Sequence, residues 1–328
     1  METPMPRSLF LAALALAAHG AFAAPHVVTT IKPLHSLVAQ LMEGAGEPVL
    51  LIKQGSPHGY QSKPSDVQAI AKADLVVYVS PTLESFVPPL IKKGQKNHIE
   101  WIAIPGLQTL KTRTGGLWEE HAHGEDDDAH ADGHDHDHGH DHGHDHAHEH
   151  DGHMHGEYND HLWLGIGTSK ALLPVVAAEL SRLDPENKSL YEQNLAKAID
   201  TLDTLHAQLG EQLAEIKTRP YMVFHDAYPY FEQEYGLNAI GVVRVDPEHE
   251  PGAKRIGELH HIMQDNKIVC LFNEPQFSAK LSAKLVQDTQ VRLGTLDPLG
   301  ADIKAGPQLH GEVLRRLATQ LHDCLQQP

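Results

Sequence analysis

The chain has 328 residues, of which 41% are hydrophobic, and a formal net charge of −18 at pH 7. Residues 119–157 hold −14 of that charge, which leaves −4 for the rest and no basic patch for nucleic acid or an anionic membrane surface. The length exceeds one ordinary domain and is enough for two.

The first 23 residues have the pattern of a secretory signal peptide. One basic residue, Arg7, precedes an apolar run from Leu9 to Ala18, and Ala21-Phe22-Ala23 forms a cleavage site of small residues. The run is too short to span a membrane, and no later segment approaches eighteen uninterrupted apolar residues. We therefore expect cleavage near Ala23 and a soluble, exported protein, most simply in a bacterial periplasm.

Residues 24–183 alternate short β-rich runs with helical patterns. Strands are expected at Val27–Ile31, Val49–Lys53, Leu75–Val79 and Ile99–Ile104. Helices are expected at Pro33–Met42, Ser65–Ala73, Leu83–Ile91 and Thr168–Leu183. This order predicts an N-terminal α/β lobe with a mostly parallel sheet and helices on both faces.

Residues 119–157 interrupt this lobe with fourteen histidines and fourteen carboxylates, and contain no lysine or arginine. Their apolar side chains are too few to offset the entropy of ordering, so we expect a disordered His/Asp-rich loop. Neutral imidazole is the commonest protein ligand for zinc, copper and nickel. The tract therefore indicates capture of a transition metal, which its alternative role as a solubilising linker would not explain.

A long helical pattern occupies residues 184–217. Asp184-Pro185-Glu186 supplies an N-cap, a first-turn proline and an acidic first turn, and apolar residues then recur at spacings of three and four up to Ile216. A continuous helix of this kind would be about 45 Å long and could connect two lobes as a rigid spine. The alternative is two ordinary helices with a break near Gly210.

Residues 218–328 repeat the alternation and predict a second α/β lobe. Strands are expected at Tyr221–Phe224, Ala239–Val243, Lys267–Phe272 and Val291–Leu296. Helices are expected at Tyr228–Tyr235, Ala253–Gln264, Ala279–Gln287 and Glu312–Leu325.

The chain has two cysteines, Cys270 and Cys324. In an oxidising compartment an isolated pair predicts a disulfide, and the alternative is two buried free thiols. A metal role is less favoured because the two cysteines lie far apart without C-x-x-C spacing.

Four residues outside the tract are candidate metal ligands. In open α/β folds ligands bind beyond the carboxyl ends of strands, and His58, His225 and Asp297 each follow a predicted strand. His161 precedes a predicted helix and has apolar neighbours that would bury it. Other histidines are interpreted as surface residues, among them His35, His98, His249 and His310.

Several short motifs are spread over the mature chain. They are Gly55-Ser-Pro-His58-Gly-Tyr60, Lys63-Pro-Ser-Asp66, Ala73-Asp-Leu-Val-Val-Tyr-Val79, His161-Leu-Trp-Leu164, Phe224-His-Asp-Ala-Tyr228, Asn273-Glu-Pro-Gln-Phe277 and Gly294-Thr-Leu-Asp-Pro-Leu-Gly300. In combination they resemble the metal-binding substrate-binding proteins of ABC transporters, and within them the zinc-uptake branch.

The resemblance implies two Rossmann-like lobes with mostly parallel sheets, joined by a long rigid helix, and a metal site in the cleft between them. It implies His58, His161 and His225 as ligands of Zn(II), which would be the transported ligand, with no organic cofactor. It also implies a monomer that delivers zinc to the membrane permease of a zinc ABC transporter.

The fourth ligand is left open by the resemblance. Some relatives carry a carboxylate beside the first ligand histidine, where Pro57 and Gly59 stand here. Asp297, which matches a ligand aspartate of relatives, or a water molecule would then complete the site. Manganese-specific relatives carry a glutamate where His225 stands, so three imidazoles favour zinc. Copper and nickel also accept imidazole and stay open as alternatives.

Catalysis is the less favoured function class. A zinc site with an open position can activate water, but the chain contains no H-E-x-x-H, no G-x-S-x-G and no complete phosphate loop. A metal buffer or surface adhesin would retain the histidine tract but would not need two lobes and a cleft. We therefore expect a binding protein for metal transport and not an enzyme.

Overall fold

The computed structural model describes residues 24–94, 96–118, 156–265 and 267–326. It contains two four-stranded sheets, each parallel throughout, in the orders β2-β1-β3-β4 and β6-β5-β7-β8. The strands of the first are β1 (Val27–Thr29), β2 (Val49–Leu50), β3 (Leu75–Tyr78) and β4 (His98–Glu100). The strands of the second are β5 (Pro220–Val223), β6 (Asn238–Val242), β7 (Cys270–Asn273) and β8 (Arg292–Thr295). The predicted class, two α/β lobes with parallel sheets, is confirmed.

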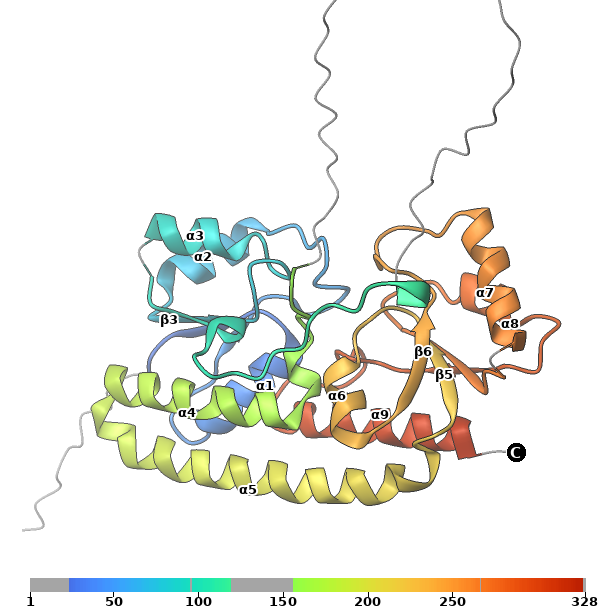
Figure 1. Cartoon of the computed structure of the whole chain (residues 1–328). Helices are drawn as coiled ribbons and strands as arrows, with labels where there is room; N and C mark the ends of the chain where they lie inside the picture. Colours follow the sequence, from blue (N-terminus) through green and yellow to red (C-terminus); the bar gives the residue numbers. More distant parts are fainter. Residues whose placement is uncertain (1–23, 95, 119–155, 266, 327–328) are drawn as a thin grey trace, which may run out of the picture.

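Helices cover both faces of the N-terminal sheet, as a parallel sheet with buried strands requires. The helices of this lobe are α1 (Lys32–Leu41), α2 (Pro64–Lys72), α3 (Val87–Gly94) and α4 (Ile166–Leu183). Helices α2 and α3 lie on one side, and α1 and α4 lie on the other (Figure 1). Every residue of β1 and β3 is buried, which explains why both strands are continuous apolar runs.

The C-terminal sheet is covered in the same way. Its helices are α6 (Pro229–Tyr235), α7 (Ala253–Asp265), α8 (Lys280–Val286) and α9 (Leu309–Gln326). Successive side chains of a strand point to opposite faces. Cys270 and Phe272 of β7 accordingly join the core that contains α9, and Leu271 joins a separate cluster with α7 and α8. The predicted disulfide is present: Cys270 is bonded to Cys324 of α9, with the two Cα atoms 6.3 Å apart.

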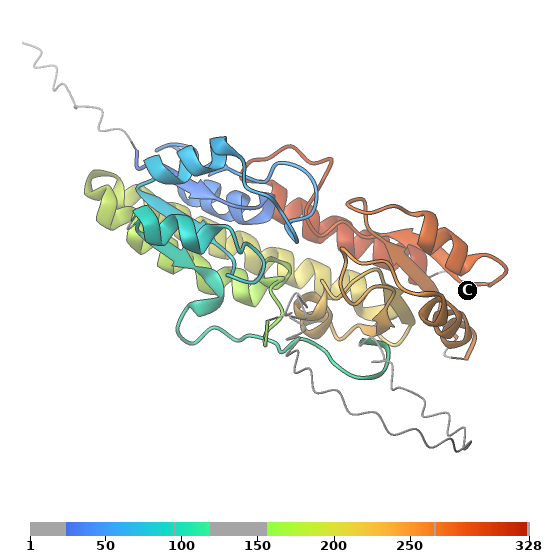
Figure 2. The ribbon, with the colours of Figure 1, turned by 90° about the horizontal axis from the view of Figure 1, so that it is seen from above.

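A single long helix, α5 (Lys188–Leu213), runs beneath both lobes (Figures 1 and 2). Short 3-10 turns at Pro185–Asn187 and Ala214–Ile216 extend it at both ends. Its buried face carries Leu202, Leu205, Leu209 and Leu213, at helical spacing. The predicted connecting helix is confirmed, and the alternative of a break near Gly210 is wrong because the helix continues through that residue. The lobe boundaries after residues 183 and 217 stay predictions.

Several predicted elements have different bounds, among them β2, which ends at Leu50, and two of the differences have a clear cause in buried side chains. Strand β4 ends at Glu100, because the fully buried Trp101 begins a 3-10 turn and donates its indole N–H to the carbonyl oxygen of Thr168. Helix α3 begins at Val87 and not at Leu83. The preceding turn is held by the buried carboxylate of Glu84, which accepts hydrogen bonds from the backbone N–H groups of residues 79 and 80.

Contacts at the base of the molecule join the lobes. The Lys32 ammonium donates to the carbonyl oxygens of residues 300, 301 and 303, and the Trp163 indole donates to that of Pro298 at 2.7 Å. Because these bonds and α5 hold both lobes, their relative position is restrained at the base. Within the described residues, no helix is both long and apolar enough to cross a membrane.

The surface assignment of two histidines is wrong. His35 and His310 are 8% and 0% exposed. The ring of His35 bonds the carbonyl oxygen of Pro48, and that of His310 bonds the carbonyl oxygen of Trp163 at 2.7 Å, so burial leaves neither ring without a partner. Burial lowers the pKa of both, that of His310 to about 4.

The buried His310 predicts an acid-sensitive fold. The unfolded chain binds a proton on this imidazole below about pH 6.5, whereas the folded chain does so only below about pH 4. The folded chain is therefore fully stable with respect to this ring above pH 6.5. As the pH falls from 6.5 to 4, protonation of the unfolded chain lowers the free energy of unfolding by about 3 kcal/mol. Urea unfolding at several pH values should show a shallower loss for His310→Asn than for the unsubstituted chain. Parallel curves would contradict this assignment.

Candidate metal centre

Three histidines from distant parts of the chain meet between the two lobes. His58 lies in the turn-rich segment after β2, His161 lies immediately before the buried 3-10 turn Leu162–Leu164, and His225 follows β5. The carboxyl ends of parallel strands share one edge of each sheet, so the loops that carry His58 and His225 face the same cleft. His161 and His225 are each 5% exposed, and His58 is half-buried.

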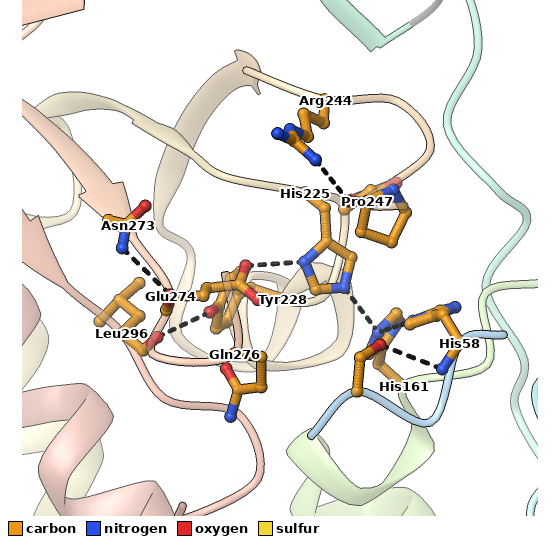
Figure 3. Close-up of polar contacts among 12 residues, drawn as sticks. His58, His161, His225, Tyr228, Arg244, Pro247, Asn273, Glu274, Gln276 and Leu296 are labelled. Carbon is orange, nitrogen blue, oxygen red and sulfur yellow. Dashed lines mark hydrogen bonds and ion pairs between the residues drawn. The ribbon is translucent and has the colours of Figure 1, made fainter. Parts of the chain in front are cut away.

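The ring nitrogens of these histidines converge on one point (Figure 3). Nε2 of His161 lies 3.4 Å from Nε2 of His58 and 3.1 Å from Nε2 of His225. One ligand atom from each residue lies within 4.8 Å of the others, and this is the only such group of histidine, cysteine and carboxylate residues in the described part of the chain. Three nitrogens at this spacing can hold one metal ion after small adjustments, since Zn–N bonds are about 2.0–2.1 Å long.

Two oxygen atoms fix which ring nitrogen is presented to the site. Nδ1 of His225 lies 2.7 Å from Oε1 of Glu274, and Nδ1 of His161 lies 3.1 Å from Oδ1 of Asn159. Both oxygens accept a hydrogen bond from an Nδ1–H group, so the Nε2 atoms of both rings keep a lone pair for a metal. Asn159 also donates to the carbonyl oxygen of Asp226, which links the loops of two ligands.

Neither Asn159 nor Glu274 was predicted to orient a ligand, although Glu274 lies in one of the family motifs. Glu274 directly follows β7, so the same strand-end rule that selected His225 could have found it. Asn159 follows no strand, and only the folded chain brings its side chain to the His161 ring.

Asp297 lies in a different arrangement from the histidines. Its carboxylate accepts hydrogen bonds from the backbone N–H groups of Leu299, Gly300 and Ala301, and from the side-chain amide of Gln276 at 2.7 Å. It is not in the group of converging ligand atoms. These contacts hold the loop after β8, and the place of Asp297 in the metal shell stays a prediction.

A crossing segment, Leu110–Trp118, runs from the N-terminal lobe to the edge of the C-terminal sheet (Figures 1 and 2). Arg113 in this segment pairs with Asp226, beside His225, and with the buried Glu232 at 2.6 Å. Its guanidinium also lies over the Trp118 ring, 3.5 Å from the centroid. Although burial disfavours the charged form, the two carboxylates raise the pKa of Arg113. Asp226 lies in the family motif Phe224-His-Asp-Ala-Tyr228, but nothing in the sequence indicated Arg113 as its partner.

Small hollows flank the three imidazoles. One hollow is bordered by Trp163, Gln276, Phe277 and Leu299. The other is bordered by Thr112, Arg113 and Trp118 of the crossing segment and by Tyr158, which follows the histidine tract. Trp118 and Gly156, the described residues that flank positions 119–155, therefore lie beside the site. Residues 119–155 of the tract, and the predicted signal peptide, lie outside the described residues.

Comparison with known proteins identifies the family. Residues 27–324 match the family model ZnuA, "Zinc-uptake complex component A periplasmic". The "High-affinity zinc uptake system protein ZnuA" of Brucella abortus is 41% identical over 304 residues, which cover 91% of each chain.

Solved structures share the fold at lower identity. A crystal structure of ZnuA superposes with a TM-score of 0.71 at 23% identity, covering 92% of this chain and 99% of that one. A mutant of the laminin-binding adhesin of Streptococcus agalactiae has the same TM-score at 21% identity, with 92% and 99% covered. The match across almost the whole chain, together with the histidine site, shows that this chain belongs to the ZnuA family.

Proposed function

We propose that this chain captures Zn(II) in the periplasm and delivers it to the membrane permease of an ABC transporter for high-affinity zinc import. The observation that carries the proposal is the convergence of three imidazole Nε2 atoms from both lobes, without a carboxylate among them. Imidazole ligands favour zinc over manganese. The 41% identical relative is named for high-affinity zinc uptake. In this reading the protein is a monomeric carrier and not an enzyme.

The ligands proposed are His58, His161 and His225, with water in the fourth position. Metal content and affinity of the mature chain would test this assignment, with zinc, manganese, copper and nickel offered in turn at buffered free concentrations. We expect one tight zinc ion and much weaker manganese. Transport would be tested by zinc uptake into cells that contain the permease but lack this protein. Failure of the added protein to restore uptake would leave a buffer or adhesin as the better reading.

Asp297→Asn is expected to lower the stability of the fold while changing zinc affinity little. An amide loses charge-assisted hydrogen bonds to three backbone N–H groups, which should lower stability by about 1–3 kcal/mol. Zinc affinity should change only a few-fold because water fills the fourth position. Thermal unfolding and metal-buffered titration of the same samples measure both effects. A loss of zinc affinity comparable to that of a histidine substitution would instead place Asp297 among the ligands.

The histidine tract is proposed to be an auxiliary collector. Its ligands are numerous, but each bound ion must order part of a segment with few apolar side chains. Deleting residues 119–155, which spares the paired Gly156 and Glu157, should reduce the number of zinc ions bound and leave one tight ion in calorimetry. Loss of the tight ion on deletion would show that the tract supplies the principal site.

A further inference from the structure

Glu274 is a buried carboxylate whose polar neighbours are the His225 ring and the hydroxyl group of Tyr228. It is 1% exposed, and its Oε1 atom lies 2.7 Å from Nδ1 of His225. Its Oε2 atom is buried and has no hydrogen-bond partner among the described residues. A buried charge is unfavourable unless an opposite charge or several hydrogen bonds compensate it. Among the described residues, no lysine or arginine compensates the charge of this carboxylate, which lies directly behind a candidate metal ligand.

Two other buried cations near the cleft have carboxylate partners. Arg113 pairs with Asp226 and Glu232, and Arg244 pairs with Glu250. Among the described residues, no lysine or arginine forms an ion pair with Glu274. The group opposite Glu274 is the His225 ring, whose far nitrogen faces the point where the three histidines converge (Figure 3).

The two orienting contacts in the site differ in charge. Asn159 holds His161 through a neutral amide oxygen, whereas Glu274 holds His225 through a carboxylate. Orientation of a ligand ring needs only an acceptor, which an amide also provides. A carboxylate adds an attraction for any cation at the site, and that attraction is proportional to the charge of the ion.

Building on the proposed function, we propose that Glu274 is a positioning residue whose charge makes this three-histidine site selective for divalent over monovalent cations. The bound metal ion then supplies a positive charge near Glu274, which no lysine or arginine of the described residues provides. Zn(II) then gains twice the electrostatic stabilisation that a monovalent ion of similar imidazole affinity, such as Cu(I), receives.

Glu274→Gln isolates the charge, because its amide oxygen can still accept the hydrogen bond from Nδ1 of His225. We expect the zinc dissociation constant to rise about 100-fold and that of Cu(I) only about 10-fold. Both ions can be titrated anaerobically into the full mature chain with chelators that fix the free metal concentration. Imidazole ¹⁵N signals of His225 report occupancy of this site irrespective of the histidine tract. Equal losses for the two ions, or a zinc loss below twofold, would overturn the proposal.

Three further variants complete the test. Glu250→Gln removes one charge from an exposed carboxylate and should leave both affinities within twofold. Glu274→Ala also removes the orienting acceptor, so both ions should weaken further. His225→Ala distinguishes the two proposals: if it retains tight zinc, the metal site itself is wrong. The metal-free Glu274→Gln chain should melt no lower than the unsubstituted chain, and a lower melting temperature would show that the carboxylate is already compensated.

Discussion

Replacing His161 with alanine is expected to weaken zinc binding by about 100- to 1000-fold. Structural zinc sites bind with about 10–16 kcal/mol, so loss of one of four ligands removes about 3–4 kcal/mol. Of the three histidines, His161 is the one whose Nε2 atom lies within 3.4 Å of both others. Its loss therefore removes the ligand that joins the N-terminal and C-terminal parts of the site.

Metal-buffered titration followed by the imidazole signals of His58 and His225 measures this effect without interference from the tract. His98→Ala is the matched control, because His98 is an exposed histidine on β4. Zinc should raise the melting temperature of the control as much as that of the unsubstituted chain, and that of His161→Ala much less. Unchanged zinc affinity in His161→Ala would exclude this cleft as the principal site.

Removing the disulfide is expected to destabilise the chain by about 4 kcal/mol. Cys270 and Cys324 are separated by 54 positions, and closure of a loop of that size restricts the unfolded chain by this amount in the chain-entropy model. In the folded chain the bond attaches α9 to β7, the strand that leads into Glu274. Both cysteines lie against apolar neighbours, so a double alanine variant avoids burying a hydroxyl group.

Urea unfolding with and without a reducing agent measures the contribution of the bond. The reductant should lower the midpoint of the unsubstituted chain and leave that of the double variant unchanged, which controls for effects on other groups. Zinc affinity should be similar in all samples, since neither cysteine lies in the converging group. An unchanged midpoint on reduction would show that the bond adds little to stability.

Local sequence was sufficient for the architecture. The alternation of short β-rich runs with helical patterns predicted both parallel sheets, because periodicity reports which faces of an element are buried. Apolar spacing from Leu190 to Ile216 predicted the long helix through Gly210. The strand-end rule selected His58, His225 and Asp297, and the apolar flank of His161 together with the family motifs selected His161. The isolated cysteine pair and an exported chain predicted the disulfide.

The tertiary structure decided which side chains hold those ligands. The Nδ1 partners Asn159 and Glu274 are 2 and 49 positions from the histidines that they orient, and Arg113 is 113 positions from Asp226. No periodic pattern encodes such pairs, because each depends on the conformation of a loop or on the packing of segments that are distant in sequence. The same reason explains the buried His310 and the loop contacts of Asp297. Sequence determined the elements and the imidazole donors, whereas loop conformation and packing between distant segments determined the orientation of those donors and placed the charge of Glu274 behind His225.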